Sequence, residues 1–464
     1  MKKNLSFSFI SILLTAVCLG IPIQADPEHF DVNDVSWLFP SPSSGEELGT
    51  LISVDSLKKA DGELLWPIPA FERALAIAES DDAAVPGFRI KLPDGADKMA
   101  NWKIAGVRFD PSAPGASREI IDKFGSDPQI RLILQPVTGT PPRPRDVTIH
   151  LIYSYSDPEE GQVPDDTFRK AIPRKADFLE VVKDLVAVKQ LSVELGATTS
   201  GQEMGVHPGL AKSASSQKVR KLMEESLVRN LSKGRLRAMA IMGLPEGRPE
   251  PWIFVAILQT ADGKFVAAPG FNTPTPNERA QALSFASGED FVLPRPISNN
   301  LAPITNKKFV PAEARRGVST AILFSQRTDL TAKAATGGGN DQANNGEIVT
   351  NRDIVDIIGN PLRSHFFNTD CVSCHTETTR ADIRKITSGG LSFKKPDTLS
   401  NLSVKVLPNG QWNVRNFGWG PGEGKPTVSR RAFNEMAESA EFINKNYVNE
   451  LEAKGEGQSP EGDK

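Results

Sequence analysis

The chain contains little cysteine: three residues in 464. This scarcity excludes a fold held together by many disulfides, because small disulfide-stapled secreted domains carry more cysteines and spread them along the chain. Cys18 lies in an N-terminal segment that we expect to be removed, which leaves Cys371 and Cys374. These two lie within one five-residue motif, so their spacing indicates a local chemical role for the pair.

An excess of basic residues is also missing. There are 54 Lys and Arg residues against 57 Asp and Glu residues, and the formal net charge is −3. A nucleic-acid-binding domain carries a clustered basic excess, so we expect no nucleic-acid partner. Aromatic residues make up 7% of the chain, whereas proline is plentiful at 35 residues. This composition favours sheets, turns and extended segments over a helical bundle.

Long apolar runs are absent beyond the N-terminus. Met1-Lys2-Lys3 precede a mostly apolar run from Leu5 to Ile23, and Ala25 precedes an acidic stretch. A basic start, a short apolar middle and a small residue at the end are typical of a secretory signal peptide. The uninterrupted apolar part is shorter than the ~20 residues of a membrane-spanning helix. We expect cleavage after Ala25, export to the periplasm or beyond, and no transmembrane segment in the mature protein.

The length of the chain predicts more than one domain. A Gly- and Asn-rich stretch interrupts the pattern of structured segments and is typical of a flexible linker. The sequence therefore divides into a signal peptide (1–25), an α+β domain of unknown function (26–335), a linker (336–346), a mostly α-helical C-terminal domain (347–452) and a disordered tail (453–464).

The α+β prediction depends on the order of the segments in the first domain. Short β-branched or aromatic runs predict strands, helical spacing of apolar residues predicts helices, and an Asp-Gly pair predicts a tight hairpin turn. Strands that are grouped before and after helices favour an α+β fold over a doubly wound sheet. The predicted strands are 89–92, 103–109, 129–134, 147–153, 236–242, 251–258 and 264–268, the helices are 177–191 and 218–231, and the turn is 261–263.

The motif Cys371-Val372-Ser373-Cys374-His375 carries the clearest chemistry in the sequence. In C-x-x-C-H, two thiols each add to one vinyl group of haem, and the adjacent histidine reaches the iron. The expected export agrees with this interpretation, because covalent attachment takes place outside the cytoplasm. We predict one covalent haem c on Cys371 and Cys374, with His375 as the proximal iron ligand.

Two other chemistries use a cysteine pair of this spacing. A structural zinc site needs four protein ligands, and no second cysteine pair is present. A thioredoxin-like dithiol needs a strand before the first cysteine and a helix beginning there. Residues 366–370 form no clear strand pattern, so haem fits the local sequence better than either alternative.

On this motif, residues 347–452 resemble the monohaem cytochrome c domain. Helical patterns lie on both sides of the motif: 354–358 followed by Asn360-Pro361 as an N-cap, and a long apolar stripe from Phe433 to Leu451 that Ser429 can cap. The resemblance implies covalent haem, proximal ligation by His375, and one-electron transfer with a redox partner protein.

The sixth iron ligand stays open at this point. The family usually supplies a methionine after the motif, but the only candidate, Met436, lies on a helical apolar stripe where core packing is the common role. His365 is close to the motif, and His207 reaches the iron only if the two domains dock. Trp412 either contacts the haem or packs in a loop. Met436, His207, His365 and no sixth ligand remain as alternatives.

This uncertainty leaves three functional hypotheses. An electron-transfer protein is favoured. A haem enzyme, peroxidase-like or another oxidoreductase, would need an open distal site. A binding or docking protein with an accessory haem would explain the size of residues 26–335.

Overall fold

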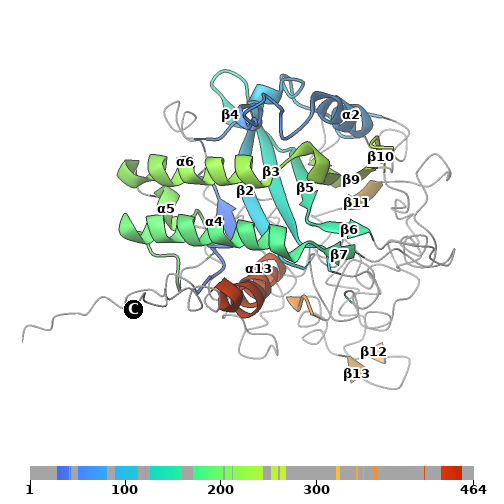
Figure 1. The fold of residues 1–464 in the computed structure, drawn as a ribbon. Helices are drawn as coiled ribbons and strands as arrows, with labels where there is room; N and C mark the ends of the chain where they lie inside the picture. The colour runs from blue at the N-terminus through green and yellow to red at the C-terminus, as the bar shows by residue number, and fades with distance from the viewer. Residues whose placement is uncertain are drawn as a thin grey trace, which may run out of the picture.

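The computed structural model describes a central sheet, the helices that pack on it and a C-terminal helix (Figure 1). The described residues are 29–40, 42, 51–80, 89–112, 121, 126–158, 171–201, 204–211, 213–243, 252–259, 262–267, 320–323, 341–342, 348–349, 359–362, 412 and 430–451. The predicted signal peptide and the predicted disordered tail lie outside them. In these ranges no helix has both the length and the apolar character needed to cross a membrane.

The sheet is antiparallel and has the strand order β1-β2-β3-β5-β8-β9-β10, with β4 paired to β3 and β11 paired to β9. Its strands are β1 (Ser36–Leu38), β2 (Trp102–Asp110), β3 (Gln129–Thr138), β4 (Arg143–Pro144), β5 (Thr148–Ser154), β8 (Leu236–Gly243), β9 (Trp252–Gln259), β10 (Phe265–Ala267) and β11 (Thr320–Leu323). Two small ribbons accompany it: β6 (Ser156–Pro158) with β7 (Ala171–Pro173), and β12 (Asp341–Gln342) with β13 (Ile348–Val349).

Helices α4 and α6 lie side by side across the sheet (Figure 1). The helices are α2 (Ile68–Ala78), α4 (Lys175–Glu194), α5 (Pro208–Ala211), α6 (Ser213–Asn230) and α13 (Arg430–Ile443), and α13 continues into a π-helical segment, η9 (Asn444–Val448). Short 3-10 turns are η1 (Val54–Ser56), η3 (Met99–Asn101) and η4 (Lys233–Arg235). Nearly every residue of β2 and β3 is buried, so these strands are covered on both faces.

Most of the segments predicted in the first domain are confirmed. The strand patterns at 103–109, 129–134, 147–153, 236–242 and 251–258 correspond to β2, β3, β5, β8 and β9. The helix at 177–191 lies within α4, and the helix at 218–231 corresponds to α6, which ends one residue earlier. The Asp-Gly hairpin is present, because β10 pairs with β9 and Gly263 has a φ of +82°. The mixed α+β architecture of this region is therefore confirmed.

The strand predicted at 89–92 is wrong. These residues are irregular, although Ile90 is fully buried and its N–H donates to the Ala78 carbonyl at 3.0 Å. The Ile90 side chain lies so close to Gly243 that a Cβ there would be 2.8 Å from it. Burial against the side of β8, rather than pairing in the sheet, accounts for its apolar character.

Helix α13 packs into the same hydrophobic core as the sheet. Its predicted apolar stripe is confirmed as a buried face, in which Phe433, Met436 and Ile443 are 5%, 0% and 0% exposed. The ring of Tyr447 lies 5.4 Å from the ring of Phe178 on α4, measured between centroids. Although α13 belongs to the C-terminal part of the sequence, it completes the core of the N-terminal part.

Asn444 joins the end of α13 to the N-terminal segment. Its Oδ1 accepts a hydrogen bond from the Phe30 N–H at 2.8 Å, and its Nδ2 donates to the Phe30 carbonyl at 2.9 Å. One side chain thus satisfies both backbone groups of Phe30, as a neighbouring strand would. A further ion pair, Lys175 to Glu450 at 2.7 Å, lies nearby on the surface.

We predict that Asn444→Ala destabilises the protein by about 1–3 kcal/mol, because it leaves two partly buried backbone groups without partners. The measurement is the free energy of unfolding in urea. Asn449→Ala is the matched control, since the Asn449 amide is exposed and bonds only to the Lys445 carbonyl in its own helix. Equal stability of the two variants would contradict the role given to Asn444.

Candidate functional site

The predicted haem-attachment residues, Cys371, Cys374 and His375, lie outside the described residues, as does His365. The nearest described segments are residues 359–362, which precede the motif, and residues 430–451, which follow it. Together with the end of β2, these two segments form the candidate site. The structure therefore describes the segments before and after the motif, and the contacts that hold them on the sheet.

The segment before the motif is fixed against α13. The Asn434 amide donates to the Gly359 carbonyl at 2.7 Å, and both groups are buried. A Cβ added to Gly359 would lie 1.9 Å from a guanidinium nitrogen of Arg430, so no larger residue fits there without displacing that side chain. Asn360 Oδ1 accepts a hydrogen bond from the Leu362 N–H at 2.9 Å, the kind of contact that an N-cap makes.

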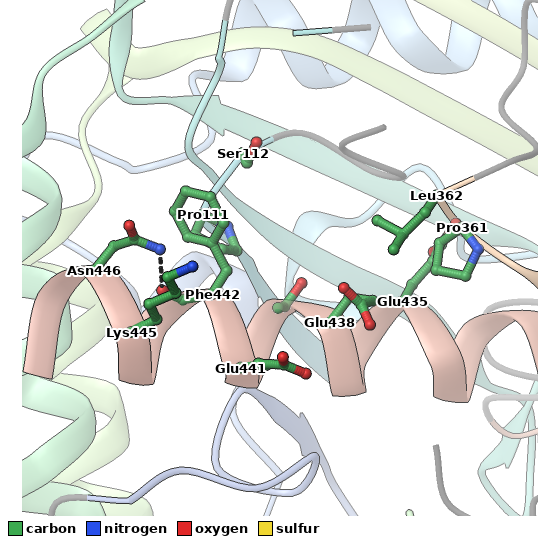
Figure 2. A pocket seen from close by; sticks show the side chains of 11 residues that line it. Pro111, Ser112, Pro361, Leu362, Glu435, Glu438, Glu441, Phe442, Lys445 and Asn446 are labelled. Carbon is green, nitrogen blue, oxygen red and sulfur yellow. Dashed lines mark hydrogen bonds between the residues drawn. The ribbon is translucent and has the colours of Figure 1, made fainter. Parts of the chain in front are cut away.

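A cleft of about 310 Å³ opens between these elements (Figure 2). This volume is at the lower end of the range for small-molecule sites. The wall formed by α13 carries several carboxylates and one lysine, whereas the opposite wall is mostly apolar. The lining residues are Pro111, Ser112, Pro361, Leu362, Glu435, Glu438, Ser439, Glu441, Phe442, Lys445 and Asn446.

Buried charges hold α13 on the sheet beside this cleft. Glu435 accepts from Arg108 on β2 at 2.6 Å and from Arg431 on α13 at 2.8 Å. Asp110 continues the network, at 3.5 Å from Arg108 and 3.1 Å from Arg131 on β3. The Arg108 and Asp110 side chains are only 6% and 2% exposed.

Glu435 stays ionised in this setting. Burial by itself would raise the pKa of the Glu435 carboxyl, but the charges of Arg431 and Arg108 and their hydrogen bonds outweigh it and lower the pKa to about 2. A carboxylate so strongly paired is a poor proton donor or acceptor near neutral pH. Its chemical role is therefore to fix α13, rather than to act as an acid or base.

The structure places His207 in a buried turn of the first domain. Its ring Nδ1 accepts a hydrogen bond from the Gly209 N–H at 3.1 Å, and its backbone N–H donates to the Leu38 carbonyl at 3.0 Å. Burial, with a further contribution from the charge of Lys189, lowers the pKa of His207 to about 3, so the ring is neutral. With Nδ1 as an acceptor, the single ring proton lies on Nε2. Neither nitrogen then has a lone pair free to bind iron.

Met436 and Trp412 both lie in packed surroundings. The Met436 side chain is completely buried in the core shared by α13 and the sheet. Trp412 is 1% exposed, and its indole N–H donates to the Phe39 carbonyl at 2.9 Å. Like Asn444, Trp412 therefore attaches the C-terminal part of the chain to residues 29–40.

A second buried ion pair was missed by sequence reasoning. Lys189 Nζ lies 2.9 Å from Asp34 Oδ2, and both side chains are at most 1% exposed. Lys189 also donates to the His29 carbonyl. In the sequence, charged residues within otherwise apolar segments, such as Arg108 in β2, were the signal that could have indicated buried ion pairs. Among the described residues, no group of three His, Cys, Asp or Glu side chains is arranged to hold a metal ion.

We predict that Glu435→Gln weakens the fold at neutral pH and reduces its sensitivity to acid. The ordinary glutamate pKa of 4.5 falls to about 2 in the folded protein. Ionised Glu435 therefore stabilises the fold above about pH 4.5, and this contribution disappears as the pH falls towards 2. A shift of this size corresponds to about 3 kcal/mol.

The test compares urea unfolding of wild type and Glu435→Gln between pH 7 and pH 2.5. Their difference in unfolding free energy should shrink as the pH falls. Glu180→Gln is the control, because the exposed Glu180 pairs only with Lys183 in the same helix. A difference that does not change with pH would refute the ionised, paired state of Glu435.

We also predict that Met436→Leu alters stability by less than about 1.5 kcal/mol, because Leu and Met have similar volumes. If the motif carries haem as predicted, the same substitution should leave the visible spectrum unchanged. A changed visible spectrum with unchanged stability would instead assign Met436 to the iron.

Comparisons of the chain with protein-family models, with curated proteins and with solved structures found no match.

Proposed function

We propose that this protein is an exported c-type cytochrome that carries one haem, bound through thioethers to Cys371 and Cys374 and through iron to His375. The observation that carries the proposal is the motif itself: the two cysteines beyond Cys18 both belong to one C-x-x-C-H sequence. A haem bound in this way transfers single electrons, at a potential set by its axial ligands, burial and hydrogen bonds.

The anchoring of α13 and of residues 359–362 supports this proposal. Eight residues, 363–370, lie between Leu362 and Cys371, the first residue of the motif, and the hydrogen bond from Asn434 to Gly359 fixes the segment that precedes them. An electron-transfer site benefits from a fixed cofactor, because the distance to the partner then stays constant. The residues on each side of the motif supply such fixed points, and Trp412 supplies a third.

The same argument extends to the fold of the C-terminal part. We propose that residues 347–452 form a small, mostly helical haem domain whose last helix, α13, is shared with the core of the sheet. The redox partner would then meet a haem domain docked on the first domain, rather than one that swings on the predicted linker.

A second candidate function is that of a haem enzyme with an open distal site, peroxidase-like or another oxidoreductase. The surroundings of Met436 and His207 support this second candidate, because Met436 is packed in the core and the His207 ring is buried in the first domain with its Nδ1 bonded to the Gly209 N–H. His365 or an open position is then left for the distal side. Ligation by His365 would favour electron transfer, whereas an open position would favour catalysis.

We predict that Cys374→Ala, expressed for export in a host with a haem-attachment system, loses most of its covalent haem, because one of the two thioethers cannot form. Haem staining after denaturing electrophoresis and a pyridine haemochrome assay measure the loss. Ser373→Ala is the control, since its side chain has no part in attachment. Full covalent haem in the Cys374→Ala protein would contradict the proposal.

The absorption spectrum with and without carbon monoxide then distinguishes the two functions. A reduced spectrum that carbon monoxide does not change indicates a six-coordinate iron and electron transfer. A spectrum that shifts on addition of the gas indicates an open position and favours the enzyme.

A further inference from the structure

A second and larger cleft lies at the far edge of the sheet from α13. Helix α13 contacts β2, near one edge of the sheet, whereas this cleft is lined by residues of β10, the end of β9, the start of α2 and the turn η4. Figure 1 shows α2 and β10 well apart from α13. Its volume is about 680 Å³, well inside the range for small-molecule binding sites. No residue of the predicted haem motif belongs to the lining of this cleft.

One wall of this cleft is apolar. Pro67, Pro69 and Ala70 at the start of α2 line it together with Phe265 and Val266 of β10, and α2 contacts β10. The lining also includes two glycines, Gly234 and Gly263, and a Cβ added to Gly263 would meet nothing within 4 Å, so the cleft is open at that residue. A flat or extended hydrocarbon body can therefore lie against this wall and lose contact with water.

The charged side chains that line the cleft are all basic. They are Arg73, Lys233 and Lys264. Lys233 lies 3.3 Å from Glu63 and Lys264 lies 2.8 Å from Asp262, but both lysines are more than 60% exposed and such surface pairs are weak. Neither carboxylate belongs to the cleft lining, so an anion inside the cleft meets positive charge first.

Arg73 is the most significant of the three. Its Nε donates to the Phe265 carbonyl at 3.1 Å, which ties the side chain to the apolar wall. Among the residues that the structure describes, Arg73 has no carboxylate partner. Its terminal nitrogens remain available as paired donors, the geometry that suits a carboxylate or sulfonate.

We propose that this cleft binds an amphipathic organic anion, with its apolar body on Pro67 and Phe265 and its carboxylate or sulfonate on Arg73. The lysines at the rim contribute long-range attraction that salt screens. A bare inorganic anion would leave the apolar wall uncovered, and a neutral hydrocarbon would leave Arg73 without a partner. The combination of wall and cation therefore selects molecules that carry both features.

The test uses 8-anilinonaphthalene-1-sulfonate as the probe and isothermal titration calorimetry on the purified full-length protein, whether or not it carries haem. We expect one saturable site, a loss of affinity of roughly tenfold or more in Arg73→Gln because a charge-assisted hydrogen bond is removed, and weaker binding at high salt. Lys183→Gln, on the exposed side of α4, is the charge-matched control and should bind as wild type does. Decanoate should compete with the probe, whereas inorganic phosphate should not.

Equal affinity of wild type and Arg73→Gln would overturn the proposal, as would the absence of a saturable site. Competition by phosphate as strong as that by decanoate would also overturn it, because the cleft would then recognise charge alone. Circular dichroism checks that Arg73→Gln is folded, and Lys233→Gln gives an independent, smaller loss. The outcome does not depend on the haem assays, so the two proposals can fail separately.

Discussion

The contact between Arg108 and Glu435 joins residues that are 327 positions apart in the sequence. It brings α13, the last α-helix among the described residues, onto strand β2 of the sheet and places one buried carboxylate between two guanidinium groups. Ion pairs in such a place do not drive folding, because each charge loses its hydration on burial. They instead favour one position of α13, since moving the helix away would remove the Glu435 partner of the buried Arg108.

The other contacts that attach the C-terminal part also join residues far apart in the sequence. Asn444 bonds to both backbone groups of Phe30, and Trp412 bonds to the Phe39 carbonyl. Both partners belong to residues 29–40, which also accept the buried Lys189 through Asp34. This N-terminal segment includes strand β1 of the sheet, so its hydrogen bonds to Asn444 and Trp412 attach the C-terminal part to the sheet domain.

This arrangement bears on how a haem in the C-terminal part would work. A flexible tether would let a cytochrome domain move between partners, whereas a docked one presents its haem in a fixed place. The described contacts of α13 and Gly359 favour the docked arrangement for the proposed cytochrome. The cleft beside Arg73 lies at the opposite edge of the sheet, so a ligand bound there and a redox partner near α13 would not exclude each other.

The sequence by itself determined the local features. Alternating and helical patterns predicted most of the strands and helices of the sheet domain, and the spacing of Cys371, Cys374 and His375 defined one chemical hypothesis. The apolar stripe of α13 was also predictable, because helical periodicity depends only on neighbours in the chain. The strand predicted at 89–92 failed because burial, and not sheet pairing, explains Ile90.

Only the tertiary structure decided which side chains from distant segments lie next to one another. No local signal pairs Glu435 with Arg108, assigns the proton of His207 to Nε2 or gathers Arg73, Lys233 and Lys264 around one cleft. These features depend on contacts between distant segments, and burial alters the energy of a charge or a ring nitrogen only after those segments have met. The chain thus encodes its motif locally, whereas the environment of its charged side chains arises from the fold.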